Sequence, residues 1–308
     1  HPILHSFPTR RSSDLPYFSQ VGDEATLTRA VQLAKRNDAV VTVAEVPKRS
    51  ASYSVVLEQR GRLDRVIASI QQDGVEARAR VLAADAPFLE IIREVLRGAH
   101  DLVILTAEAT RGVKGVLFGT TSMHLMRKCP CPVWVTHPQQ SASYKNILAA
   151  VELSGPAEND TLSQLIVELA SSLARQEQCQ LHFVHAWNFV GDDLTSAQSE
   201  ITPDMMAALV KRNEQPLETR FKKLLEAHDL TDIEHSVRLV RGGPESVIPK
   251  LASEEDMDLI VMGTVCRTGV AGFFIGNTAE TVLQQVECSV LTVKPRGFAT
   301  PIALDVSG

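Results

Sequence analysis

The chain repeats itself, and this repeat restricts its possible folds more than any other feature of the sequence. The segment AHDLVILTA at 99–107 matches DMDLIVMGT at 256–264 when the two are placed 157 residues apart. The same spacing superimposes pairs of prolines, glycines and cysteines, namely Pro87 with Pro244, Pro138 with Pro295, Gly119 with Gly276, and Cys131 with Cys288. Because self-similarity at one fixed spacing is the signature of a structural unit used more than once, we expect a duplicated domain.

Short apolar runs alternate with stretches of helical periodicity in both copies. In the second copy the runs predict strands at 145–153, 179–187, 234–241, 257–262 and 289–293, with helices at 159–174, 203–228, 244–254 and 277–286. The first copy predicts strands at 38–46, 75–83, 101–106 and 132–136, with helices at 23–36, 54–73, 87–98 and 120–128. Strands that alternate with helices of this length form crossover units, so the fold class is α/β with two doubly wound parallel sheets. The two copies are closer in the sequence at strands 38–46 and 179–187 than after them, since AVVTVAE at 39–45 matches LHFVHAW at 181–187. The second copy therefore carries extra residues after its second strand, which we place within 188–210.

The first residues do not fit this pattern. Residues 1–15, HPILHSFPTRRSSDL, lack periodicity and resemble a translated sequencing adapter, so we expect a non-native or disordered N-terminus. The first copy then has no convincing counterpart of strand 145–153, which would be central in its sheet. The expected organisation is an incomplete or patched first domain at 16–138, a second domain at 145–295 and a tail at 296–308.

Composition excludes several classes of protein. The formal net charge of −6 and the sequence pI near 5.9 leave no cationic excess for binding nucleic acid. No apolar run approaches the roughly 20 residues that span a bilayer. Five cysteines, an odd number, suit a reducing compartment better than a disulfide framework, so we expect a cytoplasmic protein.

A glycine-rich loop is the main candidate site. In open α/β sheets ligands bind at the carboxyl ends of the strands, and GTVCRTGVAGFFIGNTAE at 263–280 follows one such strand. Its glycines allow close backbone approach, the helix that begins near Asn277 offers amide groups, and Arg267 adds a cation for phosphate or carboxylate. The alternative is a loop whose glycines serve only for turning, with Asn277 as a helix N-cap.

The duplicated domain, together with GTVCRTG, GNTAE and CSVLTVKP, resembles the universal stress protein family in its tandem-domain type, over about residues 16–305. The resemblance implies a strand order of 3-2-1-4-5 in each domain, a fold like that of the adenine-nucleotide alpha hydrolases. It also implies a non-catalytic cytoplasmic role in survival under growth arrest, oxidative stress or DNA damage. Such a role would depend on binding a small ligand or a protein.

Family members that bind ATP carry Gly-x2-Gly-x9-Gly-(Ser/Thr) in this loop. The second copy has Gly263, Cys266, Gly276 and Asn277 in that frame, and the first has Thr106, Ala109, Gly119 and Thr120. The family's acidic residue after the first strand aligns with Glu152. Cys266 and Asn277 thus replace the second glycine and the hydroxyl residue of the motif. The resemblance implies ATP or AMP as the candidate ligand of the second domain, and the candidate site is Glu152, Gly263, Thr264, Arg267, Gly276, Asn277 and Thr278. Gly119 and Thr120 are weaker equivalents in the first copy.

Nothing in the sequence assembles a nucleophile, a base and an oxyanion hole, so we expect no enzyme. The alternative is a nucleotide-binding switch or weak ATP hydrolase that uses loop 263–278. Phe273 and Phe274 beside the loop suggest an apolar ligand as a third possibility, although such residues usually pack in a core.

The cysteines and the last strands carry separate expectations. Cys129 and Cys131 are too close and too few for structural zinc, so we expect buried small side chains and no metal. Cys266 is interpreted as an inert replacement of glycine, with a reactive thiol as the alternative. The last strand of each copy is an apolar edge strand. Equivalent strands of universal stress proteins pair across a two-fold axis, so we expect an intramolecular pseudo-dimer that pairs Val133, Trp134 and Val135 with Val290, Leu291 and Thr292. A homodimer or another stress protein is a further candidate partner.

Overall fold

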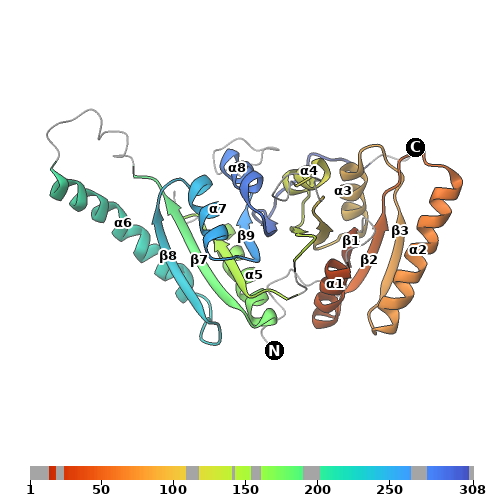
Figure 1. Cartoon of the computed structure of the whole chain (residues 1–308), viewed down its shortest axis with the longest axis horizontal. Coiled ribbons are helices and arrows are strands. Elements are labelled where there is room, and N and C mark those ends of the chain that lie inside the picture. Colours follow the sequence, from red (N-terminus) through yellow and green to blue (C-terminus); the bar gives the residue numbers. More distant parts are fainter. Residues whose placement is uncertain are drawn as a thin grey trace. The chain divides into compact units, whose positions relative to one another are not determined.

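The computed structural model describes residues 14–18, 24–108, 118–140, 143–153, 161–189, 202–264 and 276–304. The chain divides into two compact units (Figure 1). One unit comprises residues 1–143 with 264–308, and the other comprises residues 144–263. The last helix and strand of the second repeat therefore belong to the first unit.

The first unit is a parallel sheet with one antiparallel strand added. Its strands follow the order β3-β2-β1-β4-β5-β10, where only β10 runs antiparallel to its partner β5. The strands are β1 (Asp14–Phe18), β2 (Val40–Glu45), β3 (Ala77–Val81), β4 (Val103–Thr106), β5 (Val133–Thr136) and β10 (Ser289–Val293). The first five reproduce the expected order 3-2-1-4-5.

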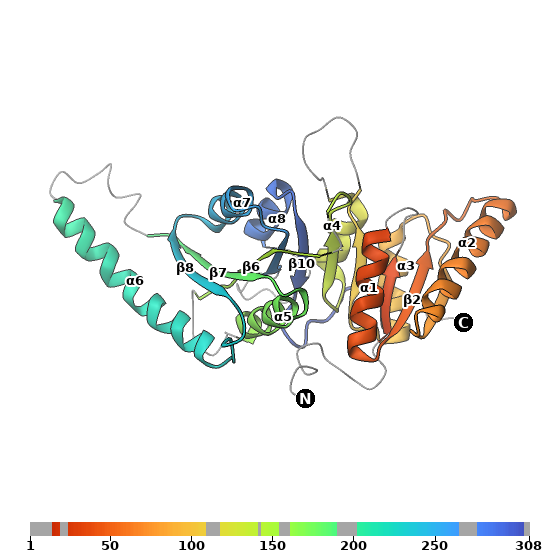
Figure 2. The same ribbon diagram turned by 60° about the horizontal axis from the view of Figure 1, so that its bottom comes forward.

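Five helices of the described residues accompany this sheet. They are α1 (Glu24–Asn37), α2 (Tyr53–Gln72), α3 (Pro87–Gly98), α4 (Thr120–Lys128) and α8 (Asn277–Gln285). Right-handed crossovers require α1 and α2 on one face and α3 and α4 on the other, because the order of strands reverses after β3. Figure 2 shows α1 and α2 together in front of β2.

The second unit is a fully parallel sheet of the order β9-β6-β7-β8. Its strands are β6 (Asn146–Ala150), β7 (Gln180–Trp187), β8 (His235–Arg241) and β9 (Leu259–Gly263). Its helices are α5 (Thr161–Glu177), α6 (Pro203–Glu226) and α7 (Pro244–Glu254). The arrangement matches β4-β1-β2-β3 of the first unit, so the duplication in sequence is a duplication in topology. The predicted α/β fold class is confirmed.

The first strand of the first repeat corrects one expectation. We expected no counterpart of strand 145–153 there, yet β1 pairs in parallel with both β2 and β4. It begins at Asp14, inside the segment set aside as non-native. The gap between β2 and β4 would leave the edges of two buried strands unpaired, and a short extended segment satisfies both. Whether its residues are the native ones stays a prediction, and residues 1–13 lie outside the described residues.

The cores consist of strand residues that are buried on both faces. Every residue of β2, β5 and β10 is buried, and Val41, Val133 and Ile147 have no measurable exposure. This burial explains why the strands read as continuous apolar runs rather than as alternating patterns.

Candidate functional site

In the second unit, Glu152 lies just beyond the carboxyl end of β6 and is held by the start of α5. The Ser163 hydroxyl donates to the Glu152 carbonyl at 2.8 Å and accepts from the Glu152 amide at 3.2 Å. Ser163 itself is completely buried, whereas Glu152 is exposed. The turn is therefore fixed while the Glu152 side chain reaches solvent, as a ligand-binding carboxylate must.

Gly263 ends β9, and its lack of a side chain has a packing reason. A Cβ at this position would lie 2.7 Å from Cδ2 of Leu162, a residue of α5. A larger residue at this position would therefore require the Leu162 side chain to move. Gly263, one of the glycines that suggested a ligand-binding loop, is thus explained by the packing of α5 on β9.

The described ends of the loop lie in the first unit and are bonded to each other. The Gly276 amide donates to the Thr264 carbonyl at 2.9 Å. Thr264 is 1% exposed, and its hydroxyl donates to the Met126 carbonyl at 3.2 Å. The Thr264 amide also donates to the Val293 carbonyl at 3.2 Å. Its hydroxyl, amide and carbonyl are therefore all engaged within the protein, so Thr264 fixes the start of the loop. Arg267, Cys266, Phe273 and Phe274 lie outside the described residues.

Helix α8 begins with glycine as its N-cap. Gly276 is the N-cap and Asn277 is the first helical residue, so the alternative in which Asn277 caps the helix is wrong. With no side chain at the cap, no side-chain hydrogen bond satisfies the first amides of α8. Asn277 and Thr278 are both exposed there. Glu280, in the first turn of α8, forms an ion pair with Arg127 of α4. Because this pair offsets the charge of the Glu280 carboxylate, Glu280 repels an anion at the start of α8 less strongly.

The first repeat has the same arrangement with one difference. Gly119 is the N-cap of α4 and Thr120 is its first residue. The carboxylate of Glu108 lies directly against this cap, because a Cβ at Gly119 would be 2.4 Å from the Glu108 carboxyl carbon. A negative charge already occupies the place where an anion would approach. The residue 157 positions later is Val265, which carries no charge.

Three hydroxyls fill the carboxyl ends of β4 and β5, a feature that sequence reasoning missed. Thr26 of α1 lies 3.0 Å from the Thr106 hydroxyl and 2.5 Å from the Thr136 hydroxyl, measured between oxygens. Thr136 also donates to the Leu105 carbonyl at 3.3 Å. Thr106 stands where the second repeat has Gly263, so the first repeat replaces a close backbone approach with a hydroxyl cluster. Thr106 and Thr136 at strand ends were the only available signal.

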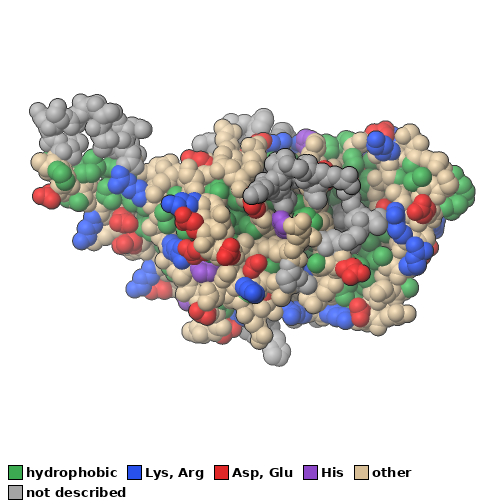
Figure 3. Space-filling model, in the orientation of Figure 1, with side chains coloured by type: hydrophobic (Ala, Val, Ile, Leu, Met, Phe, Trp, Pro, Cys, Tyr) green, Lys and Arg blue, Asp and Glu red, His purple; other side chains and the backbone are tan. Residues whose placement is uncertain are grey.

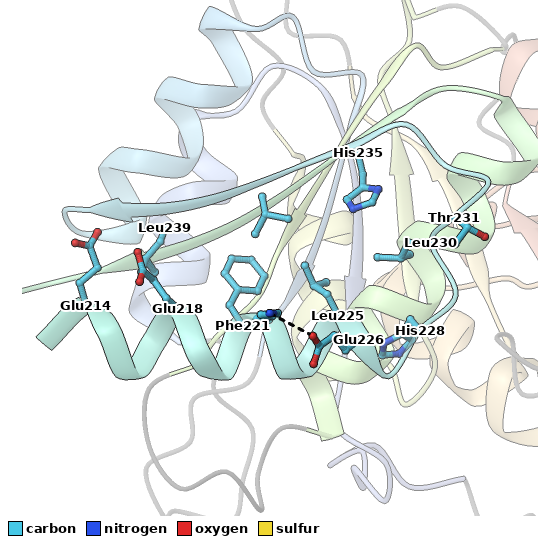
Figure 4. Close-up of a pocket in the computed structure, with 12 residues that line it drawn as sticks. Glu214, Glu218, Phe221, Leu225, Glu226, His228, Leu230, Thr231, His235 and Leu239 are labelled. Carbon is cyan, nitrogen blue, oxygen red and sulfur yellow. Dashed lines mark ion pairs between the residues drawn. The ribbon is translucent and has the colours of Figure 1, made fainter. Parts of the chain in front are cut away.

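A cavity of about 670 Å³ lies between α6 and β8 in the second unit, and it was also not predicted (Figure 4). Phe221 and Leu225 form its apolar middle, and Leu239 lies with Glu214 and Glu218 toward one end. Its volume falls within the range of small-molecule sites. An amphipathic helix beside an edge strand is the sequence signal for such a groove, but that pattern is common to many packed helices. No predicted site residue lines it.

The histidines of β7 are structural. His182 shares a hydrogen bond with the Ser236 hydroxyl at 2.9 Å, and burial lowers the pKa of its imidazole. His185 bonds to the Val151 carbonyl at 3.1 Å. Their different partners agree with side chains on opposite faces of the strand.

The surface and composition of the described residues narrow the chemistry further. No group of three or more His, Cys, Asp or Glu within the described ranges could hold a metal ion. No described helix is both long and apolar enough to cross a membrane. On the face in Figure 3, acidic and basic side chains are interspersed over the described surface.

The last strands pair as their residues suggested. Val290 lies opposite Val135, Leu291 opposite Trp134, and Thr292 opposite Val133, in antiparallel register. All six residues are at most 1% exposed. That this pairing makes the two repeats a pseudo-dimer stays a prediction.

Two doubly wound α/β repeats, each with a glycine-capped helix after its fourth strand, define a duplicated α/β protein. The family model described as "Universal stress protein family" matches residues 15–137 and again 143–294. The chain belongs to the universal stress protein family.

Relatives share the tandem organisation over nearly the whole length. The chain is 30% identical to universal stress protein E of Escherichia coli strain K12, over 92% of this chain and 93% of that protein. It is 28% identical to a universal stress protein E homolog of Haemophilus influenzae, over 80% of each chain.

Solved structures share the fold. A putative universal stress protein from Pseudomonas aeruginosa UCBPP-PA14 superimposes with a TM-score of 0.69 at 23% identity, over 92% of this chain and 93% of that one. A universal stress protein from Archaeoglobus fulgidus gives a TM-score of 0.60 at 17% identity, over 91% of this chain and 98% of that one.

Proposed function

We propose that the chain is a non-catalytic, cytoplasmic stress-response protein that acts by binding a small anionic ligand at loop 263–278 of its second repeat. Membership of the universal stress protein family supports the stress-response role. The candidate ligands are ATP, AMP or another phosphorylated metabolite. The candidate residues remain Glu152, Gly263, Thr264, Arg267, Gly276, Asn277 and Thr278.

The asymmetry between the two glycine-capped helices carries this proposal. Both α4 and α8 begin at a glycine without a side-chain cap, which favours an anion. In the first repeat the carboxylate of Glu108 lies at this position and repels one. In the second repeat Val265 stands at the equivalent position, and the acidic Glu280 is paired with Arg127. The second repeat is therefore the better anion site.

The departures from the family motif select among ligands. Cys266 replaces a glycine and narrows the space beside the backbone, so a triphosphate is less readily accommodated than a monophosphate. Asn277 replaces a hydroxyl residue and keeps a hydrogen-bonding group with a different reach. We expect AMP or a small phosphorylated metabolite to bind at least as well as ATP.

Equilibrium dialysis of the full chain with labelled ATP, AMP and other phosphorylated metabolites tests the proposal. Arg267→Ala should weaken binding about tenfold or more, because a charge-assisted bond to phosphate is lost. Arg212→Ala, on the exposed surface of α6, is the matched control and should bind as wild type does. An equal effect of the two variants, or no binding at all, would overturn the proposal.

A nucleotide-dependent switch or weak ATP hydrolase is the competing function at the same loop. It predicts stoichiometric ATP in protein purified under mild conditions and release of phosphate that Arg267→Ala abolishes. An empty loop after purification, with ligand binding but no phosphate release, supports the non-catalytic role.

A further inference from the structure

Two buried thiols and a buried lysine meet beside the paired strands β5 and β10, and the proposed function uses none of them. The Sγ atoms of Cys129 and Cys131 lie 3.5 Å apart, within hydrogen-bonding distance. Cys129 is fully buried and Cys131 is 8% exposed. Lys294 is 5% exposed, and its ammonium has no hydrogen-bond partner among the residues that the structure describes. We propose that Cys129 and Cys131 form a peroxide-oxidisable dithiol, with Lys294 as the residue that activates it.

The register of the strands explains how the three groups come together. Thr292 of β10 lies opposite Val133 of β5, so continuation of the same antiparallel register brings Lys294 opposite Cys131. Cys129 is the C-cap of α4, which places it two residues earlier at the same junction. Lys294 also lies 5.4 Å from the centre of the Phe298 ring, which covers the ammonium on another side.

The equivalent positions of the two repeats show whether packing alone requires Cys129, Cys131 and Lys294. The position equivalent to Cys129 is Val286, which caps α8 and is 2% exposed. Cys131 has a cysteine as its equivalent, but Lys294 corresponds to His137. A hydrocarbon side chain therefore suffices for the fold at the Cys129 position. The thiol pair with a buried lysine therefore occurs at one of the two equivalent junctions between the repeats, so packing of the repeats does not require it.

Electrostatics assigns different roles to the two sulfurs. Burial raises the pKa of the Cys129 thiol, but the hydrogen bond from Cys131 and the charge of Lys294 outweigh it, so the net pKa is lowered. Burial, the bond to Cys129 and the nearby charge of Asp101 leave the pKa of Cys131 well above its ordinary value. The proposal therefore assigns Cys129, the sulfur with the lowered pKa, as the attacking group, and Cys131 as the thiol that resolves the product. Burial lowers the pKa of Lys294, and the two sulfurs partly oppose that shift.

The reaction balances with one hydroperoxide as the oxidant. The Cys129 thiolate attacks one peroxide oxygen, the O–O bond breaks, and the leaving oxygen takes a proton from Lys294 and departs as alcohol or water. Cys131 then attacks the sulfenic sulfur, an S–S bond replaces the S–O bond, and the Cys131 proton leaves with hydroxide as water. The sulfurs together lose two electrons and the peroxide gains them. The lysine ends neutral, which suits a buried amine whose anionic partner has been consumed.

Hydrogen peroxide added to the reduced full chain is the probe. Trypsin should release residues 129–145 as one peptide that holds both thiols and no other cysteine. We expect this peptide to lose two hydrogens before Cys179, which is more exposed, is oxidised. In Cys131→Ser, dimedone should label Cys129 as a sulfenic acid. An unchanged peptide, or earlier oxidation of Cys179, would overturn the proposal.

Lys294 is a positioning and activating residue, and two measurements distinguish this role from a structural one. Lys294→Met should slow disulfide formation about tenfold at neutral pH and shift the pH profile of the rate to higher pH, since fewer thiolates form. Lys250→Met, at an exposed lysine of α7, is the control, because it removes one ammonium and leaves intact the trypsin sites that release residues 129–145. Thermal unfolding verifies that each variant is folded. Equal rates and equal pH profiles in a folded Lys294→Met would contradict the assignment.

Discussion

Gly263 shows how one position can suggest a ligand and yet be required by packing. The glycine belongs to the family's ligand motif, but the room beside it is taken by Leu162. A glycine in a motif indicates that another group lies close to the backbone at that position. Only the structure shows whether that group is a ligand or a side chain of the protein. Here the neighbour is a side chain of α5.

Gly263→Ala should therefore destabilise the protein. The added Cβ would lie 2.7 Å from Cδ2 of the half-buried Leu162, and overpacking costs about 1 kcal/mol where the neighbouring side chain can shift. Urea unfolding of Gly263→Ala, Leu162→Ala and the double variant measures this cost. We expect the double variant to be more stable than the sum of the single effects implies, because removal of the Leu162 side chain provides the room. If the two single effects on the free energy of unfolding add strictly in the double variant, the added Cβ does not contact Leu162 and the prediction is wrong.

Glu45 provides a pH-dependent test of burial at the end of β2. Its side chain is buried, and burial raises the pKa of the carboxyl above its ordinary value of 4.5, although the charge of Arg62 and a hydrogen bond from it act in the opposite direction. A carboxyl with a raised folded pKa prefers to be protonated in the folded state. The free energy of unfolding of the wild type therefore falls as the pH rises from the pKa of Glu45 in the unfolded chain to its pKa in the folded protein. Above the folded pKa the free energy of unfolding no longer changes through Glu45.

Glu45→Gln cannot titrate, so its stability relative to wild type should increase as the pH is raised from about 4 to about 7. The difference is about 1.4 kcal/mol for each unit of pKa shift. Urea unfolding at several pH values measures it, with Glu58→Gln on the exposed surface of α2 as the control for loss of one carboxylate. A difference that is independent of pH, or that falls, would contradict the raised pKa.

At the level of elements, hydrophobic patterning predicted most of the fold, because a buried parallel strand and an amphipathic helix each leave a distinct period. Every predicted helix and strand has an observed counterpart, from α1 to β10. The pattern failed at β1, where a segment without periodicity became a strand. Its position between β2 and β4 comes from the pairing needs of its neighbours, and local sequence does not encode these needs.

The candidate site was less predictable than the elements around it. The glycine-capped starts of α4 and α8 follow from the motif, but the carboxylate of Glu108 beside Gly119 does not. Glu108 is eleven residues from the glycine it meets, and loop geometry decides that contact. The hydroxyl cluster of Thr26, Thr106 and Thr136 joins residues up to 110 positions apart, so only the assembled sheet brings them together.

On the scale of the whole molecule, the strand of the second repeat that joins the sheet of the first repeat is the decisive feature. β5 and β10 are apolar throughout, and each would be an edge strand if its repeat were isolated. Their antiparallel pairing removes both edges without a second chain. An internal pseudo-dimer of the two repeats requires a pairing of this kind, and this is why we expect one.

Trp134→Asp tests the pseudo-dimer at the centre of this pairing. Trp134 lies opposite Leu291, is 1% exposed, and has the Arg29 guanidinium 5.2 Å from its ring centre. A buried carboxylate in this place should cost about 3 kcal/mol or more, lower the melting temperature, and expose the connecting segment 137–144 to protease. Val237→Asp, at an exposed site on β8, controls for the added charge. If Trp134→Asp leaves melting and cleavage of 137–144 as in wild type, β5 and β10 do not hold the repeats together.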